Sequence, residues 1–557
     1  MLPGTLQETE FFGREAELGD LRRRVLQAER GLAQSAYLSG PRGIGKTELL
    51  KQLFSSLFWR QDRVVPFFYS INPALVSAAS FSRSYLTQFL YQRIAFEKKE
   101  QALLYIDGVS LDELSILVEE REARWAREVL EKFARNAGDP LSALHIALNA
   151  PQQSVLTTGV PVAVLIDGFH RVKKLSIGDN PDPRLASLFE VPMSFRKTPH
   201  IIAGNEADLR DMPVSSGLER IAVPPLGLAI AATGAGSLLH AHHASKGSIP
   251  QALLIHLGGN PLYLRRVVLM AATLPNPTEA DFWKAYAHEI TEGSLALAVS
   301  SHLKCIFPDL ELRRLALTAA YKVSHSNEPL ACHQLARTFS LSVDQAEAIA
   351  HGLYRADIAR GEFGVLRSAH DRVVRDIIET LFRREILGKA SHDLAQEILE
   401  RSSAAGEEVV SYEITLPMIK EAELVAAQCL EQIGKNLHMH QDAVGQLQIA
   451  VIEACINAME HSKGTDNRVY VGVVAGKDRL EVSIESEGQE FVALEGGEPA
   501  VDREQARTSG RGWGIKLMKR YADEVKFEKT ARGTKTTLIK KLEPTAGVKK
   551  EDAISHE

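Results

Sequence analysis

The stretch Gly-Pro-Arg-Gly-Ile-Gly-Lys-Thr, at residues 40–47, decides how the first third of this chain folds. A short apolar strand at 35–39 leads into it, and a segment with helical spacing of apolar residues, 47–58, follows it. Glycines are needed in such a loop because its backbone N–H groups must turn inward and come close to phosphate oxygens. The stretch therefore predicts a phosphate-binding loop between a strand and a helix.

Each part of this loop has an expected role at a bound ATP and its Mg²⁺ ion. We expect Lys46 to reach the β- and γ-phosphates and the hydroxyl of Thr47 to bind the metal. An apolar strand at 162–166 ends in Asp167, which we expect to hold Mg²⁺ through water. The phosphates are expected to contact the backbone at three glycines, Gly40, Gly43 and Gly45.

Strands alternate with helices around the loop. Besides the strand at 162–166, apolar strands are predicted at 64–69, 201–203 and 221–223. This alternation is typical of a parallel sheet covered by helices on both faces. A charged, mostly helical insertion at about 81–149 separates the second strand from the third. It fits either a family-specific surface or additional scaffold, and both interpretations stay open.

The composition limits the class of protein. With 557 residues the chain has room for three or four domains, and 45% hydrophobic with 24% charged residues is ordinary for a soluble globular protein. A net charge of −6 argues against a nucleic-acid scaffold. The uncharged run at 221–245 contains prolines and glycines, so no membrane span is expected. No signal peptide is visible, and the scattered cysteines indicate reduced thiols in a cytoplasmic protein: Cys305, Cys332, Cys429 and Cys455.

Two further motifs accompany the loop. Residues 12–18 read Phe-Gly-Arg-Glu-Ala-Glu-Leu, and residues 259–262 read Gly-Asn-Pro-Leu. Together with the loop they resemble the AAA-like, STAND-type signalling ATPases over residues 8–285. The resemblance implies that Arg14 and Pro261 lie near the nucleotide. It also implies that the proline region senses the nucleotide and moves against the core.

The residues after the third and fourth strands bear on hydrolysis. By the resemblance, Asn205 is a polar sensor that faces the γ-phosphate; a plain turn residue is the alternative. Gly168 stands where many relatives carry an acid that orients the attacking water. Without that carboxylate a general base is missing unless Glu48 or His170 supplies it. We therefore expect slow hydrolysis, which suits a timed switch better than a motor.

The middle of the chain, 291–405, reads as short helices, a hairpin at 358–365 and a helix from Asp371. This order resembles a winged helix. Its presumed recognition helix, 343–351, bears two acids and no lysine or arginine. A helix that enters the major groove needs cations and amide donors, so we expect a structural or protein-contact role and no DNA binding.

A second set of polar residues lies near the end of the chain. Glu453, Asn457 and His461 recur every four residues in a predicted helix at 446–462, so they share one stripe; a solvated face is the alternative. The segment 453–461 closely resembles the N-box of the GHKL ATPase superfamily, and in particular the anti-sigma-factor serine kinases. The resemblance implies that Asn457 ligates Mg²⁺ and that Glu453 is the catalytic base for phosphoryl transfer. His461 is expected to cap or pack.

The resemblance to GHKL ATPases covers residues 407–541 and implies further contacts with ATP. Gly488 belongs to the box that contacts the base, and Gly533 with Thr534 borders the adenine. Backbone donors that wrap the triphosphate are implied for three glycines of the lid, Gly510, Gly512 and Gly514.

One box departs from the pattern of that superfamily. Ser486 stands where an aspartate normally contacts the adenine amino group, and Glu490 replaces the second glycine. Glu485 or Glu487 are the substitutes nearest in sequence, but neighbours in a strand point to opposite faces. A hydroxyl accepts a hydrogen bond without charge assistance, so reduced affinity or selectivity for the base is expected.

These observations predict a multidomain α/β and α+β protein. The expected parts are a P-loop ATPase core with a parallel sheet, a helical lid, a winged-helix-like domain, a GHKL (Bergerat) α/β sandwich and a disordered tail. Their predicted ranges are 1–230, 231–290, 291–405, 406–543 and 544–557.

The preferred interpretation is a bacterial regulatory ATPase, with slow P-loop hydrolysis and a serine/threonine kinase activity. By resemblance its partner in trans is a sigma factor or an anti-sigma antagonist, and homo-oligomers are compatible with it. A degenerate, non-catalytic GHKL module used for docking or oligomerisation is the alternative, and a DNA-associated loader is disfavoured. Arg196 and Arg210 are candidate arginine fingers, although a solvated surface role is favoured for both.

Overall fold

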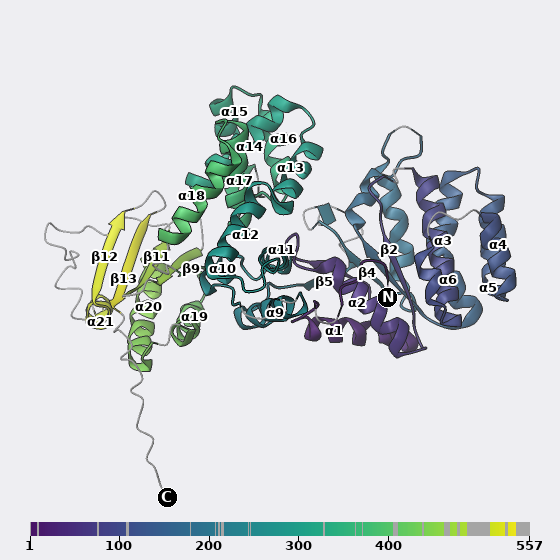
Figure 1. Ribbon diagram of the computed structural model, residues 1–557, viewed down its shortest axis with the longest axis horizontal. Helices are drawn as coiled ribbons and strands as arrows, with labels where there is room; N and C mark the ends of the chain where they lie inside the picture. Colours follow the sequence, from purple (N-terminus) through teal and green to yellow (C-terminus); the bar gives the residue numbers. More distant parts are fainter. Residues whose placement is uncertain are drawn as a thin grey trace, which may run out of the picture. The chain divides into compact units, whose positions relative to one another are not determined.

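The computed structural model divides the chain into two compact units, Met1–Leu399 and Glu400–Glu557, which are described separately below (Figure 1). The division falls inside one helix, α18 (Ser391–Ala404). The linker expected at 406–408 and the tail 544–557 lie outside the described residues. The structure describes all residues except 1, 8–9, 75–76, 107–110, 179, 206–207, 210–211, 213–216, 243, 245–246, 327–328, 363, 370, 405–409, 437–438, 462–467, 476–478, 487–512, 530–532 and 542–557.

A five-stranded parallel sheet forms the centre of the first unit, in the order β2-β3-β4-β1-β5. Its central strands are mostly apolar in sequence and almost entirely buried, as expected for strands covered on both faces. This confirms the predicted parallel sheet. The strands are β1 (Ala36–Ser39), β2 (Val65–Ser70), β3 (Val162–Asp167), β4 (His200–Ala203) and β5 (Glu219–Ala222).

Helix α2 (Lys46–Arg60) begins directly after the glycine loop. Apolar residues recur at helical spacing along it, and this stripe is buried against the sheet: Leu49, Leu50, Leu53, Phe54, Leu57 and Phe58. Helix α1 (Glu15–Leu26) and the short 3₁₀ turn η1 (Gln27–Arg30) precede β1, and η3 (Phe169–Lys174), η4 (Pro183–Phe189) and α7 (Glu190–Ser194) lie between β3 and β4.

The insertion between β2 and β3 is a helical layer at the β2 side of the sheet (Figure 1). Its first helix packs on β2 through aromatic rings, with the ring centroid of Phe67 at 5.0 Å from Tyr85 and 5.3 Å from Phe89. The inner part of the insertion is therefore scaffold. Its elements are α3 (Ala78–Lys98), η2 (Gln101–Tyr105), α4 (Leu111–Glu120), α5 (Arg124–Arg135) and α6 (Pro140–Thr158).

The rest of the first unit is mainly helical and shares one hydrophobic core, which runs from Leu226 to Leu381. A small antiparallel sheet, β6-β8-β7, is set among these helices, with β6 (Leu330–Ala331), β7 (Ala359–Glu362) and β8 (Val365–Ser368). The helices are α9 (Leu228–Ala241), α10 (Gln251–His256), α11 (Pro261–Ala271), α12 (Glu279–Thr291), α13 (Ser294–Ile306), α14 (Leu310–Ser326), α15 (Cys332–Phe339), α16 (Val343–Arg355) and α17 (Arg372–Glu385).

The second unit is an antiparallel sheet in the order β12-β13-β11-β10-β9, packed against helices. Strand β11 alternates buried and partly exposed residues, so one face is turned to the core. This confirms the predicted α/β sandwich. The elements are β9 (Val410–Pro417), α19 (Ala422–Asn436), α20 (Gln441–His461), β10 (Arg468–Ala475), β11 (Arg479–Ser486), α21 (Trp513–Tyr521), β12 (Glu524–Lys529) and β13 (Thr534–Lys541).

Within the described part of the chain, no helix has both the length and the apolar character that crossing a bilayer requires.

Candidate nucleotide sites

The glycine loop joins β1 to α2 at the carboxyl edge of the parallel sheet. Gly43 and Gly45 have φ values of 79° and 99°, in the left-handed region that favours glycine. A Cβ atom at Gly43 would lie 3.0 Å from the side chains of Asn260 and Leu262, so the loop is closely covered there. At Gly45 a Cβ would meet nothing within 4 Å, which leaves the start of α2 open.

The side chains expected at the nucleotide come together around this loop. The ammonium group of Lys46 donates to the carbonyls of Gly40 and Pro41, the latter at 3.0 Å. The Thr47 hydroxyl donates to Oδ1 of Asp167 at 2.9 Å. A hydroxyl and a carboxylate in contact, beside a lysine at a helix N-terminus, fit an Mg²⁺-bound phosphate chain.

Burial raises the pKa of Asp167, while the hydrogen bond from Thr47 and the nearby charge of Arg171 act in the opposite direction. A buried carboxylate is costly when ionised, so a cation beside it is favoured. This electrostatic situation is compatible with the metal role predicted for Asp167.

Arg14 supports the loop from the segment that precedes α1. The residue is buried; its Nη1 pairs with Glu17 at 2.8 Å and its Nη2 donates to the carbonyl of Ile44 at 3.2 Å. Beside it, a Cβ at Gly13 would lie 2.1 Å from the side chain of Ile230 on α9, so no other residue fits there without rearrangement. The segment 12–18 therefore contacts both the loop and α9.

The motif at 259–262 packs directly on the loop. The side-chain Nδ2 of Asn260 donates to the carbonyl of Arg42 at 3.0 Å, and its Oδ1 accepts from the backbone N–H of Leu262 at 3.0 Å. Pro261 is the first residue of α11, where its missing N–H is not needed. One side chain thus holds the loop and caps the helix.

Asn205 lies just after β4, between the strands that carry the loop and Asp167. Its side-chain amide donates to the backbone carbonyl of Arg355, at the end of α16, at 2.6 Å. Close by, Nε of Arg355 lies 2.8 Å from Oδ1 of the buried Asp208. The side chain of the predicted sensor, Asn205, therefore contacts the end of α16. No sequence motif predicts this contact.

The two candidate bases are engaged in other contacts. Glu48 accepts from the backbone of Leu6 and from Gln52, both at 2.9 Å. Nδ1 of His170 accepts from the backbone N–H of Asn205 at 3.2 Å, and burial lowers its pKa to about 4. His170 is therefore neutral at pH 7, and its remaining ring nitrogen carries the proton. Arg196 is exposed before β4, and Arg210 lies outside the described residues.

Helix α17 accepts polar contacts from three helices, α10, α11 and α12. Tyr263, two residues after Pro261, donates to Asp371 at the start of α17 at 2.8 Å. Nε2 of His256 lies 2.7 Å from Asp376, which also accepts from the hydroxyl of Tyr286. Burial and the neighbouring carboxylate raise the pKa of Tyr286, so its hydroxyl stays a donor. These partners are distant in sequence, and only the fold brings them together.

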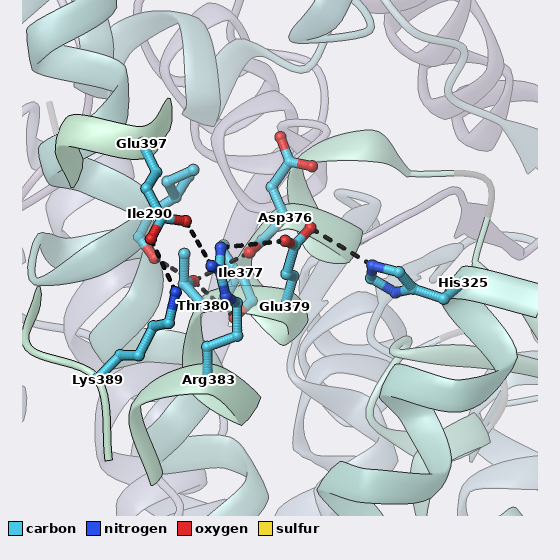
Figure 2. Close-up of polar contacts among 9 residues, drawn as sticks. All are labelled: Ile290, His325, Asp376, Ile377, Glu379, Thr380, Arg383, Lys389 and Glu397. Carbon is cyan, nitrogen blue, oxygen red and sulfur yellow. Dashed lines mark hydrogen bonds and ion pairs between the residues drawn. The ribbon is translucent and has the colours of Figure 1, made fainter. Parts of the chain in front are cut away.

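The far end of α17 contacts α18 through charged side chains. Figure 2 shows Arg383 and Lys389 directed at the two oxygens of Glu397, the lysine at 2.8 Å. These two cations lower the pKa of the Glu397 carboxyl. On the same helix, Glu379 pairs with His325 of α14 at 3.7 Å, which holds α17 between its neighbours (Figure 2).

In the second unit, Glu453 and Asn457 lie on α20 against the first turn of α21. A Cβ at Gly514 would lie 2.8 Å from Oε2 of Glu453 and 3.3 Å from Nδ2 of Asn457. The predicted base, metal ligand and one lid glycine are thus neighbours. The side chain of His461 and three of the predicted glycines, Gly488, Gly510 and Gly512, lie outside the described residues.

The strand ends that are expected at the adenine also meet. Ser486 is the last residue of β11 and is opposite Thr534 of β13, with Gly533 just before it. Ser486 is only 6% exposed and lies on the buried face, whereas Glu485 alternates to the other face. Glu487 and Glu490 lie outside the described residues. Among the described strand ends, the hydroxyl of Ser486 therefore occupies the position where the resemblance implies an aspartate.

Two family models match separate parts of the chain. Residues 10–190 match the family model of the AAA ATPase domain. Residues 419–540 match that of the histidine kinase-like ATPase domain. Both kinds of domain imply nucleotide binding.

Individual relatives cover different parts of the chain. The serine-protein kinase RsbW of Bacillus velezensis is 29% identical over 136 residues, which is 23% of this chain and 84% of that protein. A solved Walker-type ATPase of Pyrococcus abyssi has a TM-score of 0.47 at 12% identity, and the match covers 68% of this chain and 99% of that one. The ORC1 protein of Aeropyrum pernix, solved in complex with DNA, has a TM-score of 0.35 at 16% identity, and the match covers 68% of this chain and 94% of that one. The chain thus combines an AAA ATPase domain in its first part with a histidine kinase-like ATPase domain in its last part.

Proposed function

We propose that this chain is a STAND-type, nucleotide-dependent switch whose first unit controls a C-terminal module that phosphorylates or binds a partner protein. The observation that carries the proposal is the 2.6 Å hydrogen bond from Asn205 to the carbonyl of Arg355. Asn205 follows β4, which lies between β1, the strand before the glycine loop, and β3, which ends in Asp167. A γ-phosphate at the loop competes for the same amide, so triphosphate binding and the contact with α16 oppose each other.

Slow hydrolysis fits this role. His170 offers an N–H donor in place of an acceptor, and the carboxylate of Glu48 accepts hydrogen bonds from Leu6 and Gln52. His170 therefore has no acceptor nitrogen left for the proton of an attacking water, and Glu48 is held toward Leu6 and Gln52 through its Oε1. The triphosphate state of the switch is therefore long-lived.

A continuous series of contacts supports coupling between the loop and α18. Asn260 binds the loop, and the same helix carries Tyr263, which binds Asp371 on α17. At its other end, α17 binds Glu397 of α18 through Arg383. Because α18 leads into the second unit, a change at the loop has a physical route toward that unit.

In the second unit, the adjacency of Glu453, Asn457 and Gly514 supports phosphoryl transfer. Mg²⁺ and ATP supply the reactive γ-phosphate there when bound. Asn457 would hold the metal, and Glu453 would take the proton of a serine or threonine hydroxyl that attacks the γ-phosphorus, while the bond to the β,γ-bridging oxygen breaks and ADP leaves. The similarity to RsbW supports a sigma factor or an anti-sigma antagonist as the partner class.

Titration of the full chain with nucleotide tests the proposal. We expect two equivalents of ATP bound per wild-type chain, one after Lys46→Ala or Asn457→Ala, and none after both changes. Phosphorylation of candidate partners, read by mass spectrometry, should disappear with Glu453→Gln while ATP binding remains. Binding of a single equivalent that is insensitive to Asn457→Ala would contradict an active second site.

One specific observation favours a second candidate function for the last unit. Ser486 provides no negative charge for the adenine amino group, which is compatible with a degenerate module used only for docking. In that case Asn457→Ala changes neither ATP binding nor capture of the partner.

A further inference from the structure

The guanidinium group of Arg171 lies against Gly168, the position where many STAND-type ATPases carry an acid that orients the attacking water. A Cβ atom at Gly168 would be 2.9 Å from Nη1 of Arg171 and 3.3 Å from its Cζ. Gly168 itself has a φ of 71°, in the left-handed region that favours glycine. A cation therefore fills the space in which the first atoms of that acid would lie.

Hydrogen bonds from two strand ends fix the position of Arg171. Its Nη1 donates to the carbonyl of Ile71, the residue just after β2, at 2.5 Å. The backbone N–H of Ile71 donates to the carbonyl of Asp167 at 3.0 Å. The backbone N–H of Arg171 donates to the carbonyl of Gly168 at 2.9 Å. The guanidinium is therefore held at the carboxyl ends of β2 and β3, which are neighbours in the sheet.

The positive charge of Arg171 is not neutralised by an ion pair. Nearby, Lys173 pairs with Asp208 at 3.8 Å, but Arg171 forms no ion pair with any carboxylate in the described part of the chain. The bond to Ile71 takes one of the five N–H donors of a guanidinium, which stays charged at every physiological pH. Arg171 therefore adds a net positive charge to this edge of the sheet.

This charge is placed at the γ-phosphate end of the proposed first site. The hydroxyl of Thr47 contacts Asp167 at 2.9 Å, which brings the two expected metal ligands together. Gly168 follows Asp167 directly, and an acid at that position would orient the water that attacks the γ-phosphorus. A guanidinium in its place is positioned to attract the negative charge that a triphosphate has and a diphosphate lacks.

We propose that Arg171 is a specificity-determining residue of the first site and makes it prefer ATP to ADP. The inference rests on the proposed nucleotide site at the glycine loop. A guanidinium donates charge-assisted hydrogen bonds to phosphate oxygens, but it cannot take a proton from water as a carboxylate does. Arg171 thus favours the triphosphate state without speeding its hydrolysis.

The ratio of ATP affinity to ADP affinity, measured by calorimetry with Mg²⁺ on the full chain, tests this proposal. Asn457→Ala serves as the background, because it silences the proposed second site. Arg171→Gln should lower the ratio about tenfold, the effect of losing one charge-assisted contact, while its amide still donates to the carbonyl of Ile71. Arg171→Lys should recover part of the ratio, because it keeps the charge.

Arg184→Ala is the matched control. Arg184 belongs to the same connection between β3 and β4, but it is 89% exposed and pairs with Asp182 on the surface. This change should leave the ratio as it is in the background. An unchanged ratio in Arg171→Gln overturns the proposal. Equal losses of ATP and ADP affinity overturn it as well, because they indicate a purely structural contact between β2 and β3.

Lys46→Ala in the same background separates this proposal from the proposed function. If Lys46→Ala leaves ATP binding unchanged, the nucleotide site at the glycine loop is refuted, and the role of Arg171 with it. If Lys46→Ala abolishes ATP binding but Arg171→Gln keeps the full ratio, only the role of Arg171 is refuted.

Discussion

Asp208 and Arg355 form an ion pair between the segment after β4 and the end of α16, with 2.8 Å between Oδ1 and Nε. The carboxylate is buried, whereas the guanidinium is partly exposed. The pair lies beside the hydrogen bond from Asn205 to the same residue, Arg355. Asn205 and Asp208, both in the segment after β4, therefore contact the same residue of α16.

Arg355→Ala should weaken the attachment of α16 to the sheet. The change leaves Asp208 with Lys173 at 3.8 Å as its remaining cation in the described residues. The loss should be about 1 kcal/mol, since solvent screens the exposed arginine. Hydrogen exchange should become faster in α16 and after β4, and ATP should bind more tightly, because the amide of Asn205 is released toward the γ-phosphate. Arg337→Ala, an exposed change on α15, should have neither effect.

Asp167→Asn should reduce the Mg²⁺ dependence of ATP binding at the first site. A carboxylate that holds a metal through water contributes on the order of 10- to 100-fold in metal affinity. The measurement is ATP affinity with and without Mg²⁺ in an Asn457→Ala background, which silences the second site. Asp112→Asn on the surface of α4 is the control. Equal Mg²⁺ dependence in both variants would rule out the metal role.

The stability of the first unit should decrease as the pH falls from about 6.5 toward 4. Burial lowers the pKa of His170 from 6.5 to about 4, so between these values the unfolded chain binds a proton that the folded chain does not. The free energy of unfolding then falls by up to about 1.4 kcal/mol per pH unit for this group. Urea denaturation at several pH values should show a smaller decrease for His170→Gln. Identical slopes would mean that His170 titrates normally.

Tyr263→Phe should weaken the connection between α11 and α17. The change leaves the buried carboxylate of Asp371 without its tyrosine donor, at a cost of about 1–3 kcal/mol. Hydrogen exchange at α17 should then respond less to nucleotide bound at the loop. Tyr105→Phe, at an exposed tyrosine, should preserve the response. An unchanged response in Tyr263→Phe would exclude this hydrogen bond from the route.

Ser486→Asp should strengthen adenine binding at the second site. A charged acceptor forms roughly twice as strong a hydrogen bond as a hydroxyl, so a gain of about tenfold in ATP affinity is expected. The test compares ATP and GTP binding in a Lys46→Ala background, where only the second site remains. A gain for ATP without a gain for GTP supports base contact at this position. Equal changes for both nucleotides would place the base elsewhere.

Much of the first site was predictable because its residues are consecutive. The loop at 40–47 and the strand before Asp167 follow from local spacing, and the parallel sheet follows from the alternation of strands and helices. The contact of Asn205 with Arg355 was not predictable, since 150 residues separate them and neither side chain has a special pattern. The same holds for Tyr263 and Asp371. Tertiary contacts between ordinary polar residues leave no periodic signal in a sequence.

In the second unit, the stripe of Glu453 and Asn457 was predictable from helical periodicity. The neighbourhood of Gly514 and Asn457 required the fold, because α21 follows two strands later in the chain. The opposite position of Ser486 and Thr534 likewise depends on the register between β11 and β13, which no local motif fixes.

The double role of Asn260 has a consequence for how the α11 helix can separate from the glycine loop. Its side-chain oxygen caps α11 from the position just before the helix, while its side-chain nitrogen donates to the carbonyl of Arg42. Separation of α11 from the loop therefore breaks this amide–carbonyl hydrogen bond, worth about 1 kcal/mol, and removes the cover of Leu262 over Gly43, but it leaves the cap of the first turn intact. Helix α11 can therefore separate from the glycine loop as a rigid body, without unwinding its first turn.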